Sequence, residues 1–84
     1  MPKNVFKNNP LTQHYETKAK NILKGELKRR GITYAQMVDN LKAIGISETE
    51  RNLANKISRG GFSAAFFIQC LEAIGCHTLR LDDA

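Results

Sequence analysis

The sequence predicts an all-α fold of four helices, followed by a short C-terminal β-strand or extended tail. Apolar residues recur at helical spacing in four separate stretches, three of the stretches begin at residues that cap helices, and all of them end at glycine. The 84 residues, 42% of them apolar, suffice for one small domain with a single core. Such a domain has little room for a deep catalytic cleft.

The first predicted helix starts at Thr12 and ends before Gly31. Its apolar residues recur at helical spacing and so share one face of the helix: Tyr15, Ala19, Ile22, Leu23 and Leu27. Glu26 falls inside this apolar arc, so its carboxylate needs a cationic or backbone partner unless it lies at the edge of the arc.

Two capped helices follow, joined by a tight break at Gly45-Ile46-Ser47. The second predicted helix begins at the capping box Thr33–Gln36 and stops at Gly45. The third begins at another box, Ser47–Glu50, and ends at the glycine pair 60–61. The sequence therefore predicts a helix, a short turn and a second helix in succession.

The fourth predicted helix is capped by Ser63 and stopped by Gly75. Its apolar residues cover more than half of the circumference, which places it in the middle of the fold. Residues 76–81 then alternate like a short strand. Because a lone strand needs a partner, its free edge could pair with another chain.

The third predicted helix carries the most informative pattern. With its apolar residues toward the core, the opposite side holds Arg51, Asn52, Asn55 and Arg59, and Lys56 lies at the edge. Arginine can donate two hydrogen bonds to guanine, and asparagine can bond adenine in both directions. An ordinary exposed helix could carry the same residues, but the surrounding architecture favours DNA binding. We expect base contacts from Arg51, Asn52 and Asn55, and backbone contacts from Lys56 and Arg59.

The stretch from Thr33 to Ser63 resembles the helix-turn-helix core of the λ-repressor/Cro-like (XRE-type) superfamily. Gly45-Ile46-Ser47 matches its turn, and residues 57–60 are similar to the end of its recognition helix. The longer stretch from Lys20 to Leu81 looks like a small bacterial family known only as a domain of unknown function. The superfamily resemblance implies phosphate contacts at the start of the second helix, from Thr33, Tyr34 and Gln36.

The sequence also departs from that superfamily. Both helices of the motif are longer than usual by close to one turn, so the groove-facing register cannot be copied residue by residue. Tyr34 stands where the superfamily usually has a phosphate-binding Gln. The strand-like tail replaces the fifth helix through which some members dimerise.

The net charge of +5 is concentrated near the N-terminus. Residues 1–31 hold eight basic and two acidic side chains, which gives +6 and leaves −1 for the remainder. This gradient would speed association with any polyanion, although a solvated helix face explains it equally well. We divide the chain into a flexible basic arm (1–11), a single domain (12–81) and an acidic tail (82–84). Lys3 and Lys7 of the arm could follow a DNA groove.

Other chemistries fit poorly. No Cys has an obvious partner base and the carboxylates are scattered, so we expect no enzymatic activity. Cys70, Cys76 and His77 supply at most three zinc ligands without a paired C-x-x-C, so we expect no metal and no cofactor. We expect both cysteines to be reduced thiols packed in the core. Because no apolar run approaches the length of a membrane span or a secretory signal, we expect a cytoplasmic protein.

The leading interpretation is a sequence-specific binder of double-stranded DNA, a bacterial or phage-type transcriptional regulator. The alternative is a protein-interaction module, either an adaptor or antitoxin-like, built on the same helices. RNA binding ranks third, because no exposed aromatic platform is expected. We expect a homodimer, since one monomer of this size reads few base pairs and residues 76–81 offer an edge.

Overall fold

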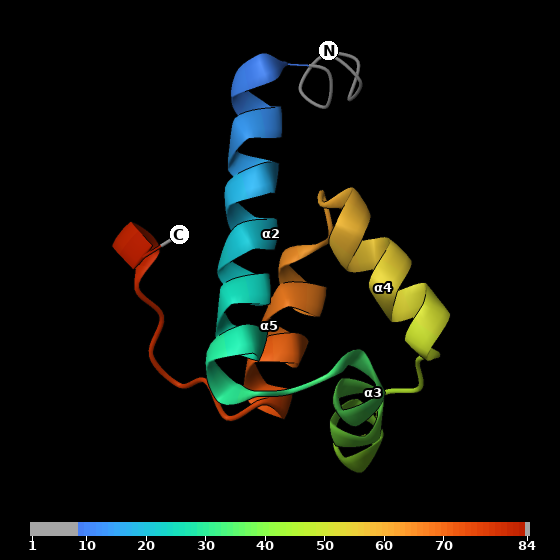
Figure 1. Cartoon of the computed structure of the whole chain (residues 1–84). Helices are drawn as coiled ribbons and strands as arrows, with labels where there is room; N and C mark the ends of the chain where they lie inside the picture. The colour runs from blue at the N-terminus through green and yellow to red at the C-terminus, as the bar shows by residue number, and fades with distance from the viewer. Residues whose placement is uncertain (1–8, 84) are drawn as a thin grey trace.

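The computed structural model describes residues 9–83, and all regular structure in this range is helical. The elements in chain order are α2 (Pro10–Arg30), α3 (Tyr34–Ala43), α4 (Glu50–Arg59), α5 (Ala64–Ala73) and the 3-10 turn η1 (Leu81–Asp83). The long helix α2 forms one side of the molecule (Figure 1), and it packs against α4 and α5, while α3 packs against α4 and α5 from below. The four predicted helices are therefore confirmed.

Two predicted helix starts are also confirmed. At α3, the Thr33 hydroxyl accepts from the backbone N–H of Gln36 at 3.2 Å, and the Gln36 side chain accepts from the Thr33 N–H at 2.9 Å. This reciprocal pair is a complete capping box. At α5, the Ser63 hydroxyl accepts from the Phe66 N–H at 3.0 Å. Short-range capping chemistry thus sets where these helices begin.

The other two helices begin elsewhere than predicted. α2 begins at Pro10, capped by the Asn9 side chain, because proline fits the first helical position well. The last residues assigned to the arm are therefore helical, and Lys3 and Lys7 lie outside the described residues. α4 is capped by Thr49, whose hydroxyl accepts from the Asn52 N–H at 3.1 Å, so the predicted box at residues 47–50 is wrong.

The connection between α3 and α4 is longer than the predicted break. It spans residues 44–49 and contains Glu48, whose carboxylate accepts from Lys56 of α4 at 2.6 Å. The helix starts after this loop because Thr49, with an extended backbone, caps it. The predicted three-residue turn is thus replaced by a loop that is tied to α4.

The C-terminal residues form an extended tail with no strand in the described part of the chain. Of the two predicted alternatives, the strand is therefore not confirmed, and the tail fits the other alternative. The tail starts at buried Cys76 and runs back beside α2 (Figure 1), with Leu79 packed against the core. Residues 82–83, assigned to the acidic tail, belong to η1.

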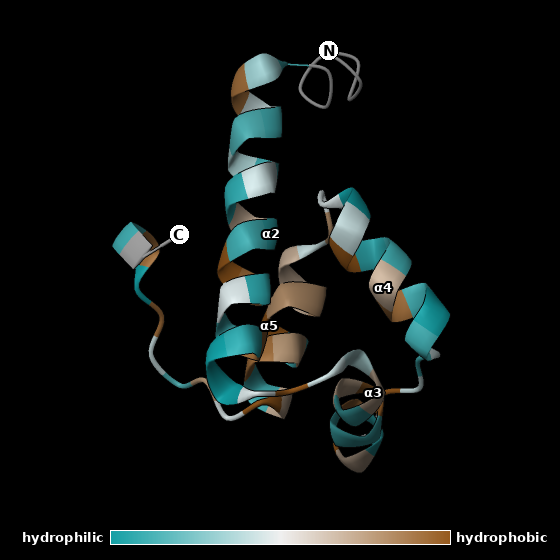
Figure 2. Ribbon diagram, viewed as in Figure 1, coloured by the Kyte–Doolittle hydropathy of each residue, from teal (hydrophilic) through white to brown (hydrophobic). Residues whose placement is uncertain are grey.

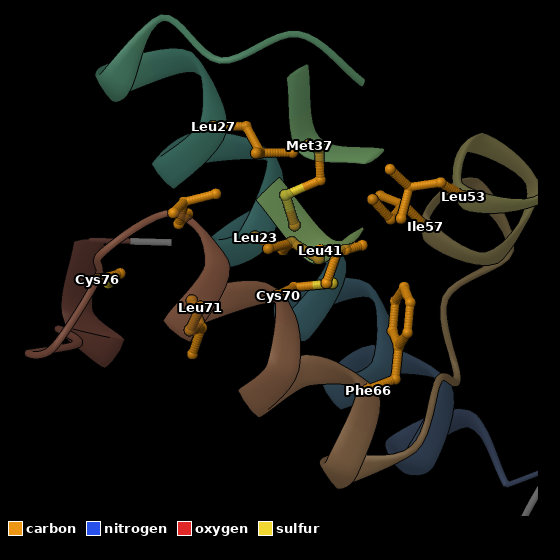
Figure 3. Packing of buried hydrophobic residues seen from close by; sticks show 11 residues of the cluster. Leu23, Leu27, Met37, Leu41, Leu53, Ile57, Phe66, Cys70, Leu71 and Cys76 are labelled. Atoms are coloured by element: carbon orange, nitrogen blue, oxygen red, sulfur yellow. The ribbon is translucent and has the colours of Figure 1, made fainter. Parts of the chain in front are cut away.

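The core lies where the four helices meet. Every helix contributes to it (Figure 3), and its fully buried side chains are Leu23, Met37, Leu41, Leu53, Ile57 and Cys70. Helix α5 is apolar along most of its length (Figure 2) and buries Phe66, Cys70 and Leu71, but Ile68, predicted to lie on its apolar face, is 56% exposed, so α5 is less enclosed than predicted. Within residues 9–83, no helix has both the length and the apolar content needed to cross a bilayer.

Glu26 has the cationic partners that its position in the apolar arc requires. Its carboxylate lies 2.8 Å from Arg29 Nη2 and 3.4 Å from Arg30 Nε, on the next turn of α2. The Cys76 thiol also donates to Glu26 Oε1 at 3.7 Å, which ties the start of the tail to α2. The prediction of a partner for this buried carboxylate is confirmed.

Candidate nucleic-acid interface

One face of α4 gathers the polar side chains singled out in the sequence. This polar face of α4 consists of four exposed residues, Arg51, Asn52, Asn55 and Arg59. The opposite side of the helix is anchored by Leu53 and Ile57, which are 0% exposed. Since residues three or four apart share a helix face, burial of these two forces the polar face outward. The outer side of α4 is accordingly hydrophilic (Figure 2).

The four side chains of the polar face are available to a ligand. Among residues 9–83, no hydrogen bond or ion pair engages any of these side chains. The C-terminal tail runs on the other side of α2 from α4 (Figure 1), so it leaves the polar face uncovered. The guanidinium and carboxamide groups therefore keep their full hydrogen-bonding capacity for a partner.

Lys56, predicted as a backbone contact, is engaged within the domain. Its ammonium lies 2.6 Å from Glu48 Oε2 and 5.1 Å from the centroid of the Phe66 ring. The Glu48 side chain is only 8% exposed, so Lys56 neutralises a carboxylate that water hardly reaches. Lys56 thus links α4 to its preceding loop and to α5, and it offers less free charge to a phosphate than Arg59 does.

The start of α3 forms a separate part of the surface. Thr33 and Gln36 are exposed, but the hydroxyl and the side-chain oxygen already serve the capping box. Tyr34 is half-buried and packs against the core. The structure does not join these residues to the polar face of α4 by any contact within the described chain. Their predicted role at phosphates depends on the positive end of the helix dipole and on the Gln36 amide N–H groups.

A hollow that no sequence pattern indicated lies beside the polar face of α4. It has a volume of about 230 Å³ and is lined by Lys56, Arg59, Gly61, Phe62, Ser63 and Phe66. Nearby, Lys20 Nζ of α2 lies 3.5 Å from the Ser58 carbonyl oxygen, which brings another cation to the end of α4. No local pattern indicates this contact, because 38 residues separate Lys20 from Ser58.

The glycine pair after α4 lies beside Glu16 of α2. Gly60 and Gly61 have φ values of +69° and +64°, which favour glycine. A Cβ atom on Gly61 would lie 2.8 Å from Glu16 Oε2, and one on Gly60 would lie 3.5 Å from the Glu16 carbonyl oxygen. At Gly60 that distance is an ordinary contact and at Gly61 only the end of the Glu16 side chain would have to move, so the positive φ values are the main reason for glycine at both positions.

Neither cysteine adds a reactive centre. Cys70 and Cys76 are both free and buried, as predicted for packed thiols. Burial raises the pKa of the Cys70 thiol to about 12, with the nearby Glu48 charge acting in the same direction. Within the part of the chain that the structure describes, no three or more His, Cys, Asp and Glu side chains cluster as a metal site would require.

These features define a small all-helical domain with one uncovered polar helix face. The chain belongs to the family described as a domain of unknown function, DUF6471, which matches residues 15–79. The matched range contains both the polar face of α4 and the start of α3. No curated protein matches the chain, and no solved structure does. The resemblance to a small family of unknown function is thereby confirmed, whereas these comparisons lend no support to the λ-repressor/Cro-like resemblance.

Proposed function

We propose that this protein binds double-stranded DNA sequence-specifically through α4, as a helix-turn-helix domain of the λ-repressor/Cro-like type. The proposal is carried by the joint exposure of two guanidinium and two carboxamide groups on one helix face, all without partners among residues 9–83. A helix has the right width for the major groove, and these are the side chains that read base edges there. Arg51, Asn52 and Asn55 contact bases, and Arg59 contacts the backbone.

The charge distribution supports the same placement. Lys56 offsets the charge of Glu48, so Glu50 is the acidic side chain that a bound duplex meets on α4. A carboxylate at the start of a helix repels phosphates, but it can accept from the amino group of cytosine in the major groove. Arg59 and Lys20 lie at the other end of α4, so that end faces the phosphates. In this role the protein acts as a transcriptional regulator.

Selection of bound sites from a random duplex library tests the proposal most directly, followed by affinity titrations on the selected site and on random duplex. Asn55→Ala should weaken the binding free energy for the selected site by about 1 to 3 kcal/mol and relax the discrimination between bases at one position of that site. The matched control is Asn21→Ala, which also removes an exposed amide, from α2, and should change the affinity for neither duplex. Equal losses on both duplexes would exclude Asn55 from base reading.

The salt dependence separates DNA binding from the protein-interaction alternative. Arg59→Ala should weaken all duplexes alike and reduce the slope of log affinity against log salt by about one. Lys42→Ala, which removes an exposed cation at the far end of α3, serves as the control. A wild-type protein with no selected site and no salt slope would favour an adaptor instead.

A further inference from the structure

Lysines follow one side of α2 at four-residue spacing. This lysine stripe consists of Lys20, Lys24 and Lys28, since residues four positions apart are neighbours on a helix surface. Lys24 and Lys28 are exposed, and within residues 9–83 neither has a hydrogen-bond or ion-pair partner. Glu26, to which the Cys76 thiol ties the tail, is two positions from each of them and so lies on the opposite side of the helix. The tail therefore leaves the stripe uncovered.

The stability of α2 does not explain this pattern. None of the residues three or four positions from Lys24 or Lys28 is acidic. Glu26 is paired with arginines on the next turn, and Glu16 lies beside the glycine pair after α4. Like charges four residues apart destabilise a helix. A cation in the last turn favours the helix dipole, but this accounts for Lys28 and not for Lys24.

The stripe connects two places where phosphate contacts are expected. At one end, Lys20 Nζ lies 3.5 Å from the Ser58 carbonyl oxygen, at the end of α4 that carries Arg59. At the other end, Lys28 lies in the last turn of α2, and a short turn then leads to Thr33, the cap of α3. The eight residues from Lys20 to Lys28 span about 12 Å along the helix. The end of α4, the stripe and the start of α3 thus follow one another along α2 (Figure 1).

We propose that the lysine stripe binds the phosphate backbone of the duplex whose bases α4 reads, an inference that rests on the proposed function. Lysine ammonium groups bind phosphates as point charges, and such contacts carry no sequence information. Lys24 and Lys28 each neutralise one phosphate and release a condensed counterion, so the stripe adds affinity for any duplex. The contacted backbone then extends from the Arg59 end of α4 to the start of α3.

Salt titrations of the full chain on the selected site and on random duplex test this proposal. Replacing both exposed lysines, Lys24→Gln with Lys28→Gln, should reduce the slope of log affinity against log salt by about two on both duplexes. Between about 50 and about 200 mM salt, the affinity of this variant should therefore fall about tenfold less than that of the wild type. The preference for the selected site over random duplex should stay unchanged, because the stripe contacts no bases.

The matched control is Lys18→Gln with Lys42→Gln, which changes the net charge equally. Lys18 is two positions from Lys20 and so lies on the opposite side of α2, and Lys42 is in the last turn of α3. This control should leave the salt slope almost unchanged. The melting temperature of the stripe variant should equal or exceed that of the wild type, because the repulsion between neighbouring lysines is removed. Lys24→Gln alone should reduce the slope by about one, which tests the proposal with a single substitution.

Three results would overturn the proposal. An equal change of slope in both double variants would show that only net charge acts, and an unchanged slope in the stripe variant would remove the stripe from the interface. In both cases, relaxed base discrimination by Asn55→Ala would leave the proposed function of α4 intact. A wild type that binds no duplex would overturn both proposals together.

Discussion

Replacing Glu26 by glutamine tests whether the buried carboxylate stabilises the fold as a charged group. The residue is 8% exposed and its carboxylate contacts Arg29, Arg30 and the Cys76 thiol. Glutamine keeps the shape and one acceptor oxygen but removes the charge. The substitution therefore isolates the charge-assisted part of these hydrogen bonds from side-chain packing.

The expected loss follows from the geometry. Hydrogen bonds to charged groups contribute roughly 1.5 to 3 kcal/mol, but the Arg29 side chain is 57% exposed, so solvent screening reduces the value. We expect Glu26→Gln to lower the free energy of unfolding by about 1 to 2 kcal/mol at pH 7. For a domain of this size, that loss lowers the melting temperature by about 5 to 15 °C.

The pH dependence has a defined sign. The hydrogen bond from Arg29 holds the pKa of Glu26 below its ordinary value of 4.5, against the opposing effect of burial. A carboxyl with a lowered pKa in the folded state contributes its stability above the ordinary value and loses it as the pH falls through the folded-state value. The difference between wild type and Glu26→Gln should therefore be constant near neutral pH and shrink below about pH 4.5.

Thermal unfolding followed by circular dichroism from pH 7 to pH 3 checks both statements. Glu72→Gln is the control, because Glu72 is an exposed carboxylate on α5, and its substitution should change stability by less than about 0.5 kcal/mol. If the difference between wild type and Glu26→Gln does not vary with pH, ionisation of Glu26 is not the source of the stabilisation and the reasoning is refuted.

Three further predictions concern local structure and chemistry. Thr49→Ala should lower the free energy of unfolding, measured with urea, by about 1 kcal/mol, because Thr49 caps α4, whereas Ser47→Ala should leave it almost unchanged. A larger loss for Ser47→Ala would support the helix start predicted from the sequence. Gly60→Ala should cost about 1 to 3 kcal/mol, because φ +69° with ψ −169° is open essentially to glycine alone, and an unchanged melting temperature would contradict this. Cys70 should resist a thiol reagent at pH 8 in the folded protein and react in urea, because burial raises its pKa to about 12; fast labelling of the native state would show that the site opens.

Much of the fold could be predicted because its determinants are local. The box from Thr33 to Gln36, the Ser63 cap and the apolar periodicity each act within a few residues of chain, and the structure contains them all. The starts of α2 and α4 were misplaced because each region offers two capping residues a few positions apart, Asn9 and Thr12 at α2 and Ser47 and Thr49 at α4. At α4 the cap is Thr49, and Glu48 before it binds Lys56, a contact between residues eight positions apart that local patterns do not reveal.

The tail was misassigned for a related reason. The alternation of Thr and Leu indicates a propensity for β structure. A strand also needs a neighbouring segment with free backbone N–H and C=O groups, and the helix α2 offers none. The tail is held instead by side chains, namely Cys76 against Glu26 and Leu79 against the core. No pattern within residues 76–81 could have revealed these partners, because both lie in elements that are distant in the sequence.

The candidate site likewise has features that depend on local sequence and features that depend on contacts distant in the sequence. Helical periodicity alone predicted which residues of α4 face solvent, and Arg51, Asn52, Asn55 and Arg59 are all exposed. The same periodicity could not predict that Lys56 binds Glu48 and lies over Phe66, or that Lys20 of α2 arrives beside Ser58. Because Lys56 is paired with Glu48 and Lys20 lies beside Ser58, the available positive charge lies at the end of α4 next to α2 rather than at its middle. A phosphate backbone bound to this domain should therefore follow the Arg59 end of α4, which leaves the Arg51 end to meet base edges.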